Sequence, residues 1–86
     1  MNIEELKNQL IATDDEILKL FIRHQELTQL ICKEKAKEGK GLYDRKAEEE
    51  LLERVVANSP QEIQNFSIEL FRTIMNTSKE HFAESK

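Results

Sequence analysis

The sequence predicts an all-α fold of three helices, one long, one short and one of medium length. The 86 residues include only two glycines and one proline, so few positions can interrupt a helix. Charged residues make up 35% of the chain, and the good helix formers Glu, Leu, Lys and Gln are frequent. Gly39, Gly41 and Pro60 therefore divide residues 1–86, a length that fits a single domain, into about three pieces.

The first predicted helix covers about residues 3–38. Its apolar residues recur at spacings of three and four or of whole heptads, as on one face of a helix: Ile3, Leu6, Leu10, Ile17, Leu20, Leu27 and Ile31. Such a helix is a rod of about 54 Å, whereas a compact chain of this length is about 30 Å across. Because the rest of the chain is too short to cover the apolar face, we predict an intertwined homodimer.

Local signals place the ends of the helices. Gly39-Lys40-Gly41 ends the first helix, since glycine adopts the left-handed conformation common at helix C-termini. Asp44 is the expected N-cap of the second helix, which ends near Asn58. Ser59-Pro60-Gln61-Glu62 has the pattern of a capping box, with Ser59 as the N-cap of the third helix and proline at its first position.

Composition also limits the classes of partner. No apolar run approaches the roughly 20 residues that span a bilayer, so we expect no membrane partner. The net charge of −4 argues against nucleic acid as the main partner. A single cysteine, Cys32, and the lack of a basic-then-apolar leader favour a cytoplasmic location.

The chain has no motif for a nucleophile or a metal site. Cys32 and His24 lie about 80° apart around a helix, so they do not form a nucleophilic pair there, and Cys32 is best interpreted as a small helix residue. His24 occupies an apolar seam position, and Lys35 follows near the same azimuth. These two basic groups could hold an anion between them, but taken alone the residues favour a hydrogen-bonded core histidine and a solvated lysine at a helix end.

The chain resembles the all-helical (AroQ-type) chorismate mutases. In that family's first helix a basic residue, an Asp, an Arg and a Lys recur at fixed spacing, and the corresponding residues here are Lys7, Asp14, His24 and Lys35. Residues 42–54 resemble the family's second helix, and residues 70–78 resemble the close of its third. The resemblance covers nearly the whole chain and implies an all-helical fold.

The resemblance implies the rearrangement of chorismate to prephenate, an intramolecular Claisen reaction. The reaction needs no nucleophile, metal or cofactor, only a dianionic substrate held in its reactive shape and donors aimed at the ether oxygen. The family pattern assigns Lys35 to the ether oxygen and a carboxylate, and Glu48 to the ring hydroxyl. Asp44 and Ser78 fall at positions associated with substrate binding.

Four positions depart from the family pattern. Lys7 stands where an arginine reaches over from the other subunit, and His24 where a second arginine binds a carboxylate. Ala47 replaces the arginine of an Arg-Glu pair, and Phe82 falls where a glutamine donates to the ether oxygen. A histidine is mostly neutral at pH 7, and one lost donor costs about 3–4 kcal/mol in the transition state. We therefore expect weakened catalysis.

Other residues and other functions fit the same pattern. Arg45 or Lys46 could compensate for the missing arginine, whereas Arg23 lies about 100° around the helix from His24 and would need local overwinding. One alternative is a dimeric binding or regulatory module that no longer catalyses. Another is an enzyme acting on a related enolpyruvyl compound, such as isochorismate or an amino analogue.

Overall fold

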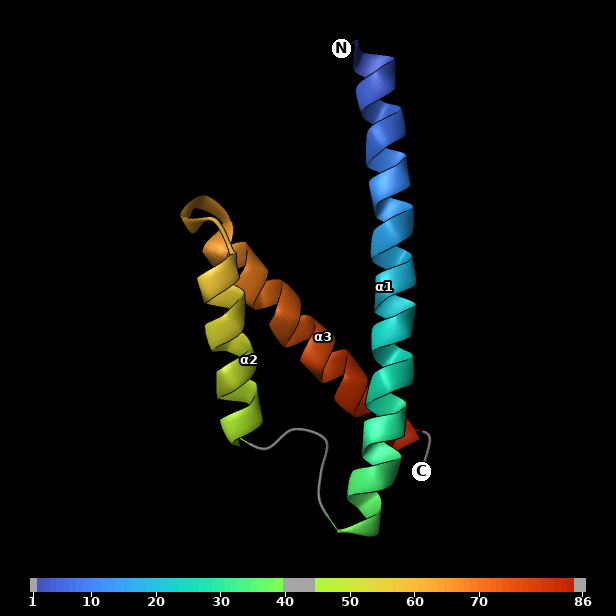
Figure 1. The fold of residues 1–86 in the computed structure, drawn as a ribbon, viewed down its shortest axis with the longest axis vertical. Helices are drawn as coiled ribbons and strands as arrows, with labels where there is room; N and C mark the ends of the chain where they lie inside the picture. Colours follow the sequence, from blue (N-terminus) through green and yellow to red (C-terminus); the bar gives the residue numbers. More distant parts are fainter. Residues whose placement is uncertain (1, 40–44, 85–86) are drawn as a thin grey trace.

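A computed structural model describes residues 2–39 and 45–84, and the side chains of these as far as His81. The chain folds into three α-helices and one turn of 3₁₀-helix (Figure 1): α1 (Ile3–Lys37), α2 (Arg45–Asn58), η1 (Gln61–Ile63) and α3 (Gln64–Glu84). The predicted all-α class and the order of long, short and medium helices are confirmed. The pairing of two copies stays a prediction.

Both ends of α1 follow from local chemistry. Asn2 is the N-cap, and its side-chain Oδ1 accepts from the backbone N–H of Glu5 at 2.9 Å. Just beyond the helix, Gly39 has φ +75°, and its N–H donates to the carbonyl of Ala36 at 3.1 Å. The prediction that Gly39 ends the first helix is therefore confirmed, whereas the predicted N-cap Asp44 lies outside the described residues.

The start of α3 differs from the prediction. Ser59 is not its N-cap, because the Ser59 hydroxyl forms a hydrogen bond with the hydroxyl of Ser67 instead. Pro60 precedes the turn η1 without a side-chain cap, and α3 begins only at Gln64. The side-chain Nε2 of Gln64 donates to the backbone carbonyl of Val56 at 3.2 Å. Contacts between α2 and α3 therefore determine the conformation of this turn.

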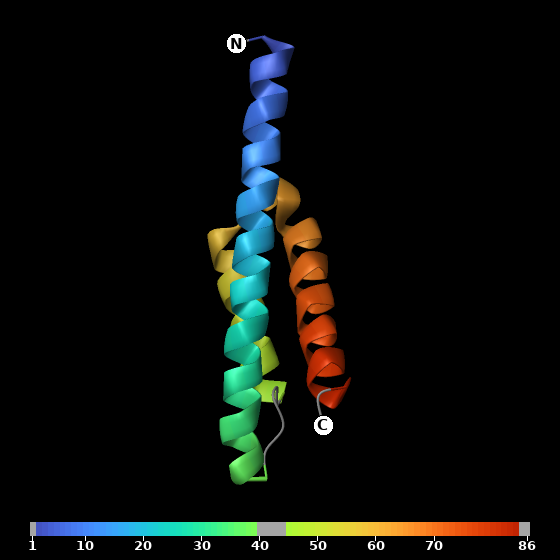
Figure 2. The same cartoon turned by 90° about the vertical axis from the view of Figure 1, so that its right-hand side faces the viewer.

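The helices are arranged around α3, which packs against both α2 and α1 (Figures 1 and 2). Among the described residues, no Cα atom of α2 lies within 8 Å of a Cα atom of α1. The N-terminal part of α1 extends past the α2–α3 hairpin as an isolated rod (Figure 1). The radius of gyration is 15.9 Å and the longest extent 54 Å, against about 12 Å for the radius of gyration of a compact chain of this length.

Little of the described chain is buried. Cys32 and Met75 are its buried apolar side chains, and Thr28 and Ser78 are its buried polar ones. The apolar face of α1 is exposed along its whole length, from 41% at Leu27 to 69% at Leu20. The face that α1 turns to α3 is therefore the one with Thr28 and Cys32, and the described residues leave most of the apolar face exposed.

Candidate functional site

An ion pair between Glu48 and Lys79 joins the N-terminal end of α2 to the C-terminal part of α3 (Figure 1 shows the two helices). Glu48 lies in the first turn of α2 and is half-buried. The ammonium Nζ of Lys79 contacts Glu48 Oε1. Sequence reasoning selected Glu48 but missed Lys79, although Lys79 lies four residues after the buried Met75 and so shares its face of the helix.

Ser78 connects α3 to α1. Its side chain is fully buried, its hydroxyl donates to the carbonyl of Ile74 at 2.9 Å, and it accepts from Gln25 Nε2 at 3.0 Å. A serine hydroxyl has one hydrogen, which is used here within the helix. In the single chain the partners of Ser78 are therefore Ile74 and Gln25, and its place in a substrate pocket stays a prediction. Gln25 was not selected from the sequence.

Lys35 belongs to the face of α1 that packs against α3. It is half-buried and follows the buried residues Thr28 and Cys32 at helical spacing. It also lies in the last turn of α1, where the helix dipole favours a cation. The side chain is therefore partly withdrawn from solvent, unlike the other lysines of α1, which are exposed.

His24 lies at an apolar hollow of about 420 Å³ between α1 and α3, whose other lining residues include Leu20, Leu70 and Ile74. The ring nitrogen Nδ1 is buried and has no hydrogen-bond partner among the described residues. The alternative of a hydrogen-bonded core histidine therefore does not hold for this nitrogen. A buried ring nitrogen without a partner is unfavourable, so this position gains from a ligand or a second chain that supplies one.

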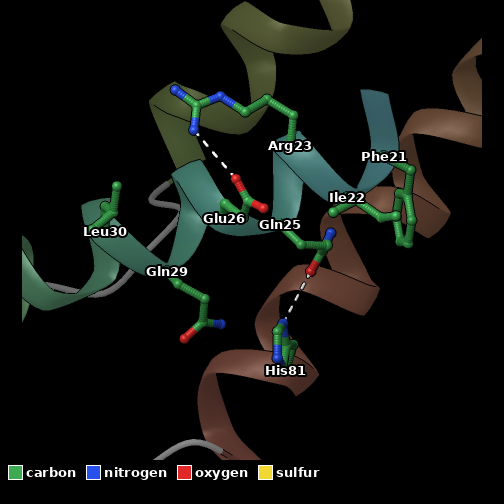
Figure 3. A pocket seen from close by; sticks show the side chains of 8 residues that line it. All are labelled: Phe21, Ile22, Arg23, Gln25, Glu26, Gln29, Leu30 and His81. Carbon is green, nitrogen blue, oxygen red and sulfur yellow. Dashed lines mark hydrogen bonds and ion pairs between the residues drawn. The ribbon is translucent and has the colours of Figure 1, made fainter. Parts of the chain in front are cut away.

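Arg23 does not replace His24. Its guanidinium pairs with Glu26 Oε2 at 3.3 Å, and its side chain lines a separate hollow of about 530 Å³ on another side of α1 (Figure 3). In that hollow, Gln25 and His81 face one another, with 3.2 Å between Gln25 Oε1 and His81 Nδ1 (Figure 3). Arg23 extends away from this pair.

The other residues selected from the sequence lie away from the Glu48–Lys79 pair, are neighbours of it in sequence, or lie outside the described residues. Lys7 is exposed in the N-terminal part of α1, where its Nζ lies 3.9 Å from Glu4 Oε1. About 42 Å of helix separates Lys7 from Lys35, too far for one small molecule to bridge. Ala47 is half-buried beside Glu48, and the side chain of Phe82 lies outside the described residues.

The described part of the chain meets the requirements of neither a metal site nor a membrane-spanning helix. It contains no group of three or more His, Cys, Asp or Glu side chains that could hold a metal ion. None of its helices has the length and apolar character needed to cross a membrane.

Comparison with known families identifies the family of the chain. A family model described as chorismate mutase type II matches residues 6–82. The chain belongs to the type II chorismate mutase family. Searches among curated proteins and among solved structures gave no match. The family match includes α2 entirely and nearly all of α1 and α3, so it covers Lys7, His24, Lys35 and Glu48.

Proposed function

We propose that this protein is a chorismate mutase that rearranges chorismate to prephenate at a rate lowered by its substituted site. The observation that carries the proposal is the family match over residues 6–82. Lys35 and Glu48, the residues assigned to the ether oxygen and the ring hydroxyl, are both retained and half-buried.

In the proposed reaction the protein supplies position and charge only. Lys35 donates to the ether oxygen, where negative charge develops as the bond breaks, and this donation stabilises the transition state. Glu48 accepts a hydrogen bond from the ring hydroxyl and orients the ring. The partial burial of both side chains strengthens these contacts relative to contacts in bulk water.

We further propose that two copies of the chain complete the site as an intertwined dimer. Support comes from the apolar face of α1, which the described chain leaves largely exposed: Ile3, Leu6, Leu10, Ile17, Leu20, Leu27 and Ile31 are all exposed. Exposed apolar surface of this extent is typical of an interaction surface. The N-terminal part of α1 carries Lys7, so a second copy can bring its own Lys7 to the site, as the family pattern implies.

The test follows the loss of chorismate absorbance with purified protein and with Lys35→Ala. Turnover is expected in the unchanged protein, and its loss is expected in Lys35→Ala, because the donor to the ether oxygen is removed. Lys33→Ala is the matched control, since Lys33 is an exposed lysine on the same helix. Turnover that survives Lys35→Ala contradicts the assigned site.

A second candidate function is a binding or regulatory module that no longer catalyses. The histidine at position 24 and the alanine at position 47 favour it, because both remove a guanidinium from the family pattern. In that case no chorismate is consumed, while a dicarboxylate transition-state analogue still raises the unfolding temperature. Offering isochorismate and an amino analogue in the same assay tests the related-substrate alternative.

A further inference from the structure

The Glu48–Lys79 ion pair brings a cation to the carboxylate that the proposed function assigns to the substrate. We propose that Lys79 binds a substrate carboxylate and supplies the positive charge that Ala47 lacks. This inference rests on the proposed function and names a residue to which the family pattern assigns no role.

The position of Lys79 on α3 favours this role. Met75, Ser78 and Lys79 lie within about 100° of one another around the helix, and the first two are buried. Lys79 therefore stands at the edge of the inward face, with its side chain 44% exposed. Its aliphatic stem can pack along this face while the ammonium group reaches Glu48 and the solvent-accessible rim.

The charges at the ends of the two helices suit an anionic ligand. Glu48 lies at the positive end of α2, and Lys79 lies toward the negative end of α3, so each side chain is favoured where it stands. Glu48 alone would repel a dianion, and the paired ammonium offsets that repulsion. An ammonium group has three hydrogens, so it can contact Glu48 and a ligand oxygen together.

The neighbouring cations at the start of α2 are less suited to this role. Arg45 pairs with Glu49 at 3.2 Å and its side chain is 93% exposed. Lys46 is also exposed. Lys79 contacts Glu48, so the contact itself selects Lys79 over the two candidates that the sequence suggested.

The test compares Lys79→Met with Lys46→Met in the full chain. The change to methionine keeps an unbranched apolar stem and removes the charge, and Lys46 offers the same loss of charge at a nearby exposed position. Calorimetry with a bicyclic dicarboxylate transition-state analogue measures affinity, and loss of chorismate absorbance measures turnover. For Lys79→Met we expect an affinity about tenfold lower. This lies at the lower end of the range for a hydrogen bond to a charged group, because the side chains of Lys79 and Glu48 are both partly exposed.

Two further variants separate a binding role from a structural one. Adding Ala47→Arg to Lys79→Met is expected to restore the affinity, since it returns a cation to the same site. Lys79→Gln, which keeps a donor for Glu48 without the charge, is expected to weaken binding as Lys79→Met does, and far-UV circular dichroism verifies folding of each variant.

The outcomes distinguish the inference from the function on which it rests. Unchanged affinity in a folded Lys79→Met or Lys79→Gln protein overturns the role of Lys79 and leaves the proposed function standing. Equal losses in Lys79→Met and Lys46→Met also overturn it, because the effect is then one of net charge. If the unchanged protein binds neither chorismate nor the analogue, the proposed function and the inference fail together.

Discussion

Gln25 on α1 donates from Nε2 to Ser78 Oγ on α3 at 3.0 Å, across 53 positions of sequence. The other end of the same amide, Oε1, lies 3.2 Å from His81 Nδ1. Because few apolar side chains of the described chain are buried, we expect this polar contact to contribute to the α1–α3 packing.

Replacing Gln25 by alanine is expected to destabilise the fold by about 1 kcal/mol, because buried Ser78 loses a donor while keeping its bond to Ile74. Urea unfolding followed by circular dichroism measures the free energy of unfolding. Asn76→Ala, at an exposed position of α3, is the control. Equal effects of the two substitutions would show that the Gln25–Ser78 bond contributes nothing of its own.

His24 predicts a gain of activity when a guanidinium is restored. His24→Arg places a permanent cation where the family pattern has a carboxylate-binding arginine, so turnover is expected to rise. Steady-state assays of chorismate loss measure turnover, and unchanged turnover in a folded His24→Arg protein argues against the role of His24.

The exposed apolar face of α1 predicts that a charge on it disrupts the dimer. Leu10, 61% exposed in the single chain, lies on that face. Leu10→Glu is expected to convert a dimer to monomer or unfolded chain and to abolish turnover, because a buried unpaired carboxylate is costly. Sedimentation velocity at micromolar concentration is the measurement. Asn8→Glu introduces the same charge about 160° around the helix and serves as the control.

The unchanged protein also tests the dimer prediction. If the unchanged protein sediments as a stable, compact monomer at micromolar concentration, the apolar face of α1 does not serve to pair two copies.

The left-handed conformation of Gly39 predicts that replacing this glycine lowers the stability of the fold. Its φ of +75° lies in the left-handed region, and a Cβ atom added there meets nothing within 4 Å. Gly39→Ala is therefore expected to cost about 1 kcal/mol through backbone strain alone. Thermal unfolding provides the measurement, and Gly39→Asn, which tolerates this conformation better, is expected to cost less. An unchanged unfolding temperature for Gly39→Ala would mean that the backbone at the end of α1 adopts another conformation at little cost.

The sequence by itself determined the elements that depend on local chemistry. Helical spacing and the scarcity of glycine and proline predicted three helices, and the boundary at Gly39 is where the chain turns left-handed. The length of the first helix predicted a 54 Å rod, and the chain measures 54 Å. The spacing of Lys7, Asp14, His24 and Lys35, together with residues 42–54 and 70–78, suggested the family.

Only the tertiary structure decided which side chains meet. Ser59 has the local pattern of an N-cap, yet its hydroxyl bonds to Ser67 because α2 and α3 pack together there. Lys79 and Gln25 carry no local signal for their contacts, since the packing of α3 against α1 and α2 sets their partners, Glu48 and Ser78. Helix ends are local properties of the chain, whereas a site depends on how the helices pack.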